Sequence, residues 1–205
     1  MFNTLVLISV FTVMLVLKSF VSILPSVLVA ALRWKENINI EASVKTSRDR
    51  DFSALVLIIP FCLTVFRFRI YDPKFISGLP DNPRLLSVIG IFVLYLLIRK
   101  ATSTLIQPQS IPQKTYAAAE KSANTFFIIL TLALLSLCSI SSFCGVDLHT
   151  IKVLSLWLSA LIYGLYALRK LQIFTASCSL FAGFLYLCAL EILPTVILVA
   201  SDVIF

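Results

Sequence analysis

The stretch Leu171–Phe205, LQIFTASCSLFAGFLYLCALEILPTVILVASDVIF, decides the fold class. Its first part, Leu171 to Leu190, is uncharged and long enough, at about 1.5 Å per residue, to cross a hydrocarbon core of about 30 Å. Glu191 then interrupts the apolar run, and Pro194 follows shortly after it. A carboxylate inside an apolar helix is energetically costly, so Glu191 is the first candidate for a functional site.

The composition of the whole chain agrees with this stretch. Of its 205 residues, 60% are hydrophobic and only 13% are charged. A soluble domain has about 25% charged residues. We therefore expect one integral membrane domain over residues 1–205, with the lipid bilayer as its surroundings.

The net charge of +7 has a membrane explanation as well. In a soluble protein such an excess would suggest nucleic acid as a partner. Here the Lys and Arg residues lie in short loops beside apolar segments, where they set membrane orientation and meet anionic headgroups. We expect no nucleic-acid partner.

Hydropathy predicts an all-α polytopic transmembrane helix bundle. The predicted spans are roughly residues 2–24, 52–66, 85–98, 122–145, 151–168 and 171–193. The first apolar run lacks a basic n-region, which favours a retained span over a signal peptide. After Lys18 the chain is apolar again, with Pro25 inside the run. Residues 19–32 are therefore either a separate interfacial helix or the continuation of one long, kinked first helix. The alternative fold is accordingly five spans plus an interfacial helix.

The segments between the spans are short. Arg33–Asp51 is polar and is expected to face solvent, and Arg67–Arg84 contains turn signals with proline. Asp147 is a plausible N-cap for the fifth span. Arg169 and Lys170 mark a very short turn into the sixth span.

Basic residues predict the orientation. With six spans, the loops on one side contain 12 Lys and Arg residues and those on the other side contain 5. The side richer in basic residues is normally cytoplasmic. Both termini are therefore expected on the opposite, periplasmic side.

Glu191, Pro194 and Lys18 are the polar or helix-breaking residues that stand out. Counted from a helix start near Leu171, Glu191 lies about 30 Å along the helix, near the outer membrane boundary. It then serves either as an anchor of helix packing or as a group that handles a proton or ion. Pro194 cannot donate a hydrogen bond to the Leu190 carbonyl and so frees an acceptor near the glutamate. Lys18 either snorkels to the headgroups or pairs with Glu191, which requires the long, kinked first helix.

Other residues suggest contacts with lipid and between helices. Two arginine pairs could bind lipid headgroups or could simply be solvated: Arg48 with Arg50, and Arg67 with Arg69. Two small-xxx-small steps, Ala160 to Gly164 and Ser179 to Gly183, predict close antiparallel packing of the fifth and sixth helices.

No motif indicates catalysis. His149 is the only histidine, and no metal-ligand spacing surrounds it. The chain has no G-x-S-x-G, H-E-x-x-H or P-loop sequence. We expect no cofactor, no metal and no enzymatic activity.

The segment Tyr186–Pro194, Y-L-C-A-L-E-I-L-P, resembles the C-terminal signature of a family of multipass inner-membrane proteins from the Bacteroidetes lineage. The early Lys after the first apolar run and the polar first loop are also similar to that family. The resemblance implies a bacterial inner membrane and brings no catalytic residue with it.

Three functions remain open at this point. The first is a non-enzymatic subunit or assembly partner of a larger inner-membrane complex, in contact with other membrane proteins or with further copies of itself. The second is a small transporter or ion-coupled carrier that uses Glu191. The third is a lipid-modifying membrane enzyme.

Overall fold

The computed structural model describes residues 2–105, 112–176 and 180–204, and these residues form helices without any β-strand. The all-α prediction is therefore confirmed. The helices are α1 (Phe2–Leu32), α2 (Trp34–Ala42), α3 (Val44–Val56), α4 (Ile58–Arg67), α5 (Lys74–Ser77), α6 (Asp81–Leu105), α7 (Gln113–Phe143), α8 (Leu148–Thr175), α9 (Leu180–Leu187), the π-helical turn η1 (Cys188–Ile192) and α10 (Leu193–Ile204).

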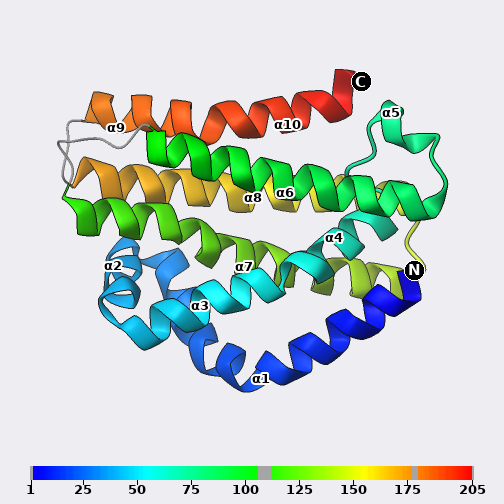
Figure 1. Cartoon of the computed structure of the whole chain (residues 1–205), viewed down its shortest axis with the longest axis horizontal. Helices are drawn as coiled ribbons and strands as arrows, with labels where there is room; N and C mark the ends of the chain where they lie inside the picture. The colour runs from blue at the N-terminus through cyan, green and yellow to red at the C-terminus, as the bar shows by residue number, and fades with distance from the viewer. Residues whose placement is uncertain (1, 106–111, 177–179, 205) are drawn as a thin grey trace.

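The long helices run side by side along the length of the molecule (Figure 1). Helix α3 continues into α4, and α9 continues through η1 into α10, so each of these pairs traverses the bundle as one rod. Both termini lie at one end, which we call the terminal end. The opposite end, which we call the basic end, holds α2, the end of α6, the start of α7 and the end of α8.

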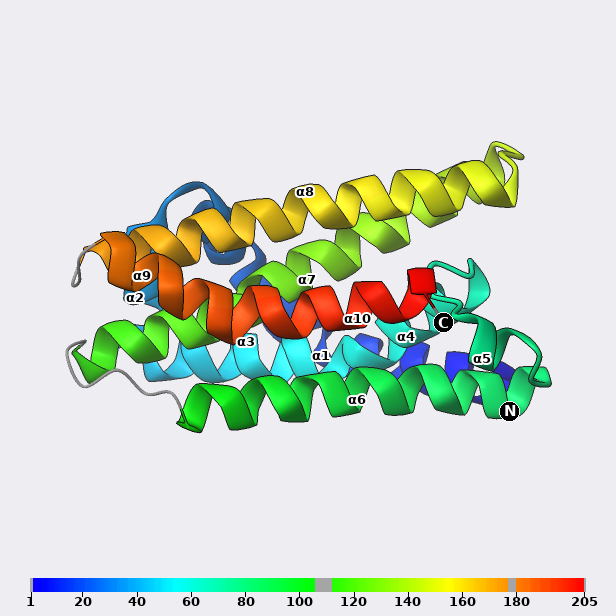
Figure 2. The same cartoon turned by 90° about the horizontal axis from the view of Figure 1, so that it is seen from above.

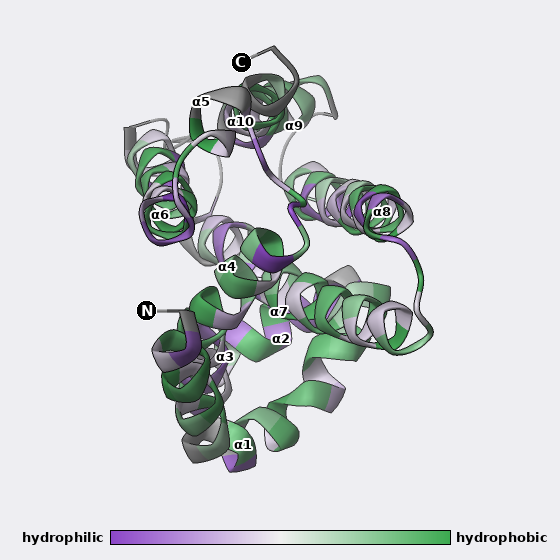
Figure 3. Ribbon diagram, turned by 90° about the vertical axis from the view of Figure 1, so that its right-hand side faces the viewer, coloured by the Kyte–Doolittle hydropathy of each residue, from purple (hydrophilic) through white to green (hydrophobic). Residues whose placement is uncertain are grey.

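The rod of α9, η1 and α10 lies between α6 and α8 (Figure 2). Helix α7 packs along α8 and also contacts α1, α3 and α4, so it forms the centre of the bundle. Its buried side chains include Ile128 and Leu134, which are almost completely covered, and also Thr125 and Thr131. Apolar residues also cover much of the outer surface of the helices (Figure 3).

Three helices are long and apolar enough to cross a membrane. They comprise residues Asp81–Thr104, Thr115–Phe143 and Leu148–Thr175. Shorter apolar helices cover Asn3–Met14 and Phe20–Leu32. These three helices support a membrane location by length and composition.

Several helix boundaries differ from those predicted. The polar stretch Arg33–Asp51, which was expected to face solvent, forms α2 and the start of α3, and it buries Asn37 and Arg50. Helix α8 continues through Arg169 and Lys170 to Thr175, so these residues do not form the turn that was expected. The physical reason is that both side chains find partners inside the bundle, which removes the need for the chain to expose them in a loop.

Helix α1 is the long version of the first helix, continuous from Phe2 to Leu32 with Pro25 inside it. Its last carbonyl groups are capped by side chains from elsewhere. Asn37 Nδ2 donates to the Ala30 oxygen at 3.2 Å, and Arg169 Nε donates to the Ala31 oxygen at 3.0 Å. These bonds satisfy acceptors that a helix end leaves open and connect α1 to α8.

Asp147 is confirmed as the N-cap of α8. Its carboxylate accepts a hydrogen bond from the Thr150 backbone N–H at 2.9 Å. This hydrogen bond holds the pKa of the Asp147 carboxyl below its usual range.

Candidate functional site

Glu191 lies near the middle of the last helical rod, not near its outer end. The rod begins at Leu180 instead of Leu171, so Glu191 is only about 16 Å from its start. The prediction that Glu191 lies near the outer membrane boundary is therefore wrong. Its side chain is buried, with 2% of its surface exposed.

The backbone around Glu191 is a π-helical turn that ends at Ile192, two residues before Pro194. Proline has no N–H, so it cannot donate to the carbonyl four residues earlier in the regular α-helical pattern. The chain adopts the wider π pattern here, in which the Leu193 N–H bonds to the Cys188 oxygen. Such turns occur frequently at functional sites because they redirect side chains.

Arg99 of α6 binds Glu191 with its planar guanidinium. Its Nε lies 2.9 Å from Oε2 and 3.2 Å from Oε1 of the carboxylate, and its Nη2 lies 2.9 Å from Oε1. Nη2 also donates to the Tyr166 hydroxyl at 2.9 Å. A fork of this kind combines charge with fixed geometry and is among the stronger ion pairs in proteins.

Lys170 of α8 binds the same carboxylate. Its ammonium group forms an ion pair with Glu191 Oε1 and lies 3.4 Å from the Tyr166 hydroxyl. The ammonium also lies over the rings of Tyr166 and Phe174, at 5.8 and 5.7 Å from their centres. We refer to Arg99, Tyr166, Lys170 and Glu191 together as the Glu191 cluster.

Helix α6, helix α8 and the last rod each contribute two polar residues to this site, and the two residues have the same spacing in each. Each supplies one charged residue and one hydroxyl residue four positions away on the same helical face. The pairs are Tyr95 with Arg99, Tyr166 with Lys170, and Glu191 with Thr195. The hydroxyls of Tyr95 and Thr195 lie 3.2 Å apart, one helical turn from the charged groups toward the terminal end. The cluster therefore continues into a polar seam between α6, α8 and the last rod.

The charges of the Glu191 cluster connect helices that are far apart in sequence. Burial of an ion is costly unless the ion is paired and hydrogen-bonded. Here one carboxylate accepts bonds from two cations, so the three helices cannot separate without exposing buried charge to an apolar environment. The arrangement can hold the helices together, and it places ionisable groups where a proton or an ion could be handled.

A second ionic group lies at the basic end, and we call it the Arg50 cluster. Arg50 is completely buried, with Nη2 at 3.0 Å from Glu41 and 2.9 Å from Asp51. Lys121 of α7 binds Glu41 at 2.6 Å, and Asn124 donates to Asp51 at 2.9 Å. The prediction that Arg50 contacts lipid headgroups is therefore wrong, because α2 and α3 fold back onto α7 and enclose its side chain.

The Glu41 carboxyl of this cluster stays ionised readily. Its burial acts to raise the pKa, but hydrogen bonds from Lys121 and Arg50 outweigh that effect. The pKa of Glu41 therefore lies below its ordinary value of 4.5.

The other basic candidates are on the surface. Arg48 is exposed on α3, whereas Arg67 and Arg69 are exposed where α4 ends. Lys18 is exposed on α1. Although α1 is the long, kinked helix that a pair with Lys18 required, Glu191 binds Arg99 and Lys170 instead.

The two small-residue steps differ in their surroundings. Ala160 and Gly164 are exposed on the outer face of α8, so the predicted contact through them is not found. Gly183 of α9 is buried against α8, and a Cβ atom there would lie 3.3 Å from the Phe174 Cβ. Ser179 lies outside the described residues.

The sequence did not identify Arg99 and Lys170 as partners of Glu191. Both were assigned to loops, because a basic residue at the end of an apolar run usually marks a boundary. A signal was available in the hydroxyl residues one helical turn before them, Tyr95 and Tyr166, which lie on the same faces. Such pairs on two apolar helices indicate an inward polar face.

Among the described residues, no group of three or more His, Cys, Asp or Glu side chains could hold a metal ion. Neither the search of curated proteins nor the search of solved structures gave a match. A family model does match, the one described as domain of unknown function (DUF4271), over residues 3–201. Because this match covers nearly the whole chain, the protein belongs to the DUF4271 family.

Proposed function

We propose that the protein is a non-enzymatic integral membrane protein that acts as a subunit or assembly partner of a larger complex in a bacterial inner membrane. In this proposal six helical segments cross the bilayer: α1, α3 with α4, α6, α7, α8, and the last rod. Both termini then lie on the periplasmic side, since the basic end carries most of the Lys and Arg residues.

The observation that carries the proposal is the contrast between the inside and the outside of the bundle. The buried charges of the Glu191 and Arg50 clusters are used for contacts between the protein's own helices. The outer faces offer large apolar side chains, including Leu7, Phe11 and Trp157, which are 71%, 62% and 72% exposed. A bundle that is tied together internally and apolar outside is suited to packing beside other membrane helices.

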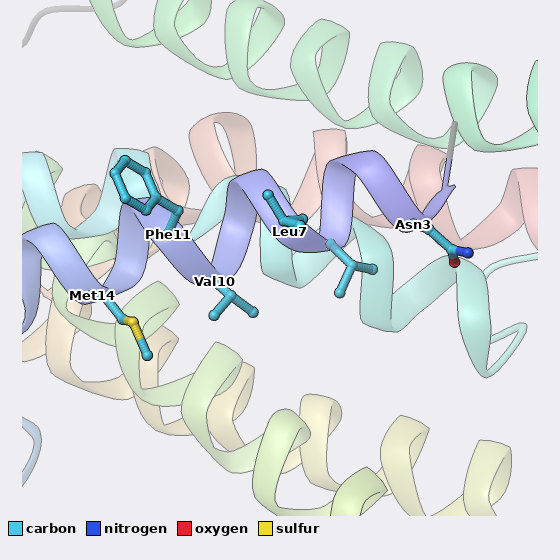
Figure 4. Close-up of a pocket in the computed structure, with 6 residues that line it drawn as sticks. Asn3, Leu7, Val10, Phe11 and Met14 are labelled. Atoms are coloured by element: carbon cyan, nitrogen blue, oxygen red, sulfur yellow. The ribbon is translucent and has the colours of Figure 1, made fainter.

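Two places on this outer surface are shallow grooves rather than smooth helix faces. One follows the first half of α1 and is lined by Asn3, Val6, Leu7, Val10, Phe11 and Met14 (Figure 4). The other lies on α8 between Val153 and Ala160, beside Trp157. Concave apolar surfaces allow a neighbouring helix to approach closely.

Site-specific photocrosslinking in the native membrane tests this proposal. A photoreactive residue at Phe11 or Trp157 should give a discrete adduct of higher mass, and twice the chain mass would identify a second copy of the protein. Leu97 of α6 is a matched control, since it is 62% exposed and lines neither groove. Absence of discrete adducts at both grooves, together with a monomer after mild detergent extraction, would reject the proposal.

The second candidate function is a small ion-coupled carrier that uses Glu191. It is favoured by the π-helical turn and by the polar seam that three helices build around this carboxylate. Ionisable groups within membrane bundles commonly mark ion or proton pathways. Proteoliposomes that contain a pH-sensitive dye should then show proton movement with the natural chain and none with E191Q, whereas K100Q should behave like the natural chain.

A further inference from the structure

Four polar atoms at the Arg50 cluster are buried without a hydrogen-bond partner in the described part of the chain. They are Asn37 Oδ1, Arg50 Nη1, Ser53 Oγ and Thr125 Oγ1. The residues that carry them are at most 1% exposed, and we call them the unpaired polar group. A buried donor or acceptor that stays unpaired costs its full desolvation penalty, so each of these atoms requires a partner.

Ser53 and Thr125 lie in the same layer of the bundle. Helices α3 and α7 are joined at the Arg50 cluster by the hydrogen bond from Asn124 to Asp51. Ser53 follows Asp51 by two positions on α3, and Thr125 directly follows Asn124 on α7. The two residues are therefore less than one helical turn from the same hydrogen bond.

Asn37 and Arg50 belong to the same junction. Asn37 of α2 lies one helical turn before Glu41, which binds Arg50. Its Nδ2 donates to the Ala30 carbonyl of α1, which fixes the amide and leaves Oδ1 as an acceptor. The hydrogen bonds of Arg50 within the described chain involve Nε and Nη2, so the two N–H groups of Nη1 remain as donors.

The unpaired polar group lies between the Arg50 cluster and an apolar core of α1, α3 and α7. Ile128 of that core follows Thr125 by three positions on α7, and Leu57 follows Ser53 by four positions on α3. Residues at this spacing share a helical face. Helices α1, α2, α3 and α7 all contact one another, so the unpaired atoms are enclosed at one helix junction.

The charges at this junction indicate which kind of molecule fits it. Arg50 and Lys121 are paired with Glu41 and Asp51, so two positive charges meet two negative charges. An added ion would have no counter-charge inside the bundle, which is costly. The unpaired atoms include the donors of Arg50, the acceptor of Asn37 and two hydroxyl groups that can do both. They call for a neutral molecule that donates and accepts hydrogen bonds.

We infer that this junction of α1, α2, α3 and α7 is a binding site for ordered water. A buried water makes about three hydrogen bonds to polar groups that are otherwise unpaired. Water at this site accepts from Arg50 Nη1 and donates to Asn37 Oδ1, and the hydroxyls of Ser53 and Thr125 complete its surroundings. It joins α2, α3 and α7, and through the Asn37 amide it also supports the end of α1. The site is independent of the proposed role in a complex.

Thermal unfolding of the full chain in mild detergent tests whether the Thr125 hydroxyl is bound. T125V replaces this hydroxyl by a methyl group of similar size. We expect T125V to lower the melting temperature by about 2–4 °C, because a buried hydrogen bond is lost. If the hydroxyl had no partner, its removal would leave the melting temperature unchanged or raise it, and that result would overturn the inference.

A double variant tests whether Ser53 and Thr125 share the same water. In a chain that already carries S53A, T125V should lower the melting temperature less than it does in the natural chain, because the shared network is already broken. The comparison also removes the separate effect of alanine on helix stability. An equal effect of T125V in both chains would contradict a shared water.

T131V is the matched control. Thr131 lies on the same helix, is 1% exposed, and donates to the Phe127 carbonyl of its own helix at 2.8 Å. That carbonyl keeps its helical bond from the backbone when the hydroxyl is removed. T131V should therefore lower the melting temperature less than T125V does. An equal or larger fall in T131V would overturn the inference, since the change from Thr to Val would then account for the effect.

Two measurements on the natural chain identify the occupant. An experimental map that resolves ordered water should contain a peak within hydrogen-bond distance of Arg50 Nη1, and a map that shows other buried waters but none here would overturn the inference. Replacement of chloride by gluconate should leave the melting temperature unchanged. If chloride stabilises the natural chain but not T125V, an anion occupies the site and the assignment to water is wrong.

Discussion

At the scale of single residues, the position of Glu191 in the last rod is what makes it unusual. It accepts charged hydrogen bonds from two different helices, and it lies in a π-helical turn that ends two residues before Pro194. Because two cations share one carboxylate, removing the carboxylate should lower the free energy of unfolding more than removing one of the cations.

We expect E191Q to lower the free energy of unfolding by about 3–5 kcal/mol, because it leaves two buried cations without their counter-charge. K170M should cost much less, since it leaves a balanced pair of Arg99 and Glu191 with an apolar neighbour of similar length. Unfolding in mixed detergent micelles, followed by circular dichroism, measures both changes. An equal cost for E191Q and K170M would contradict the unequal charge balance of the cluster.

Glu41 predicts a dependence of stability on pH. Its pKa in the folded chain lies below the ordinary value of 4.5, so its ion pairs stabilise the fold above that pH. This contribution is lost as the pH falls through the lower, folded pKa. E41Q should therefore be less stable than the natural chain near neutral pH, and the difference should shrink as the solution is acidified.

The measurement is the melting temperature of both chains from about pH 6 to about pH 3. E36Q is a suitable control, since Glu36 lies on the same short helix and accepts a hydrogen bond only from Asn39 within the described chain. A difference between E41Q and the natural chain that stays constant with pH would rule out the assigned role of Glu41.

At the scale of helices, the two glycines of the small-residue steps distinguish packing from lipid exposure. Gly183 lies against Phe174 of α8, whereas nothing lies within 4 Å of a Cβ atom built at Gly164. We expect Gly183→Leu to destabilise the protein by about 1–3 kcal/mol through overpacking. Gly164→Leu should change the stability by about 0.5 kcal/mol or less, because the site is open.

Thermal unfolding in one detergent compares the two glycine variants directly. Similar costs for Gly183→Leu and Gly164→Leu would mean that α9 does not pack against α8 through Gly183. Trp157, Ala160 and Gly164 are all exposed on α8. If Gly164→Leu destabilises the protein in the membrane but not in detergent, a neighbouring helix packs on that face of α8.

At the scale of the whole molecule, the arrangement of the helices predicts which segments share a side of the membrane. The segments near Ser77 and Gly145 lie at the terminal end, and Ser43 lies at the basic end between α2 and α3. Alkaline phosphatase fused after Ser77 or Gly145 should be active, whereas a fusion after Ser43 should not. A green fluorescent protein fused after Ser43 should fluoresce.

Equal phosphatase activity at Ser43 and Gly145 would refute the proposed orientation. The proposal has three spans between Ser43 and Gly145, an odd number, which places the two positions on opposite sides of the membrane. Equal activity would mean that the number of spans between them is even. The five-span alternative predicts opposite sides for the two termini, so a fusion at each terminus tests it.

The sequence by itself determined the fold class, the approximate places of the apolar helices, the N-cap at Asp147 and the exceptional character of Glu191. These properties depend on local composition: hydropathy over about 20 residues, a side chain beside a helix start, a charge within an apolar run. A single chain contains that information in adjacent residues.

Only the tertiary structure decided the partners of Glu191, the enclosure of Arg50 and the true ends of α8 and the last rod. Arg99 and Lys170 lie 92 and 21 residues from Glu191 along the chain. Whether basic residues at the end of an apolar run form a turn or continue a helix depends on whether another helix offers a counter-charge at the same depth. That is a property of which helix faces meet, and hydropathy does not encode it.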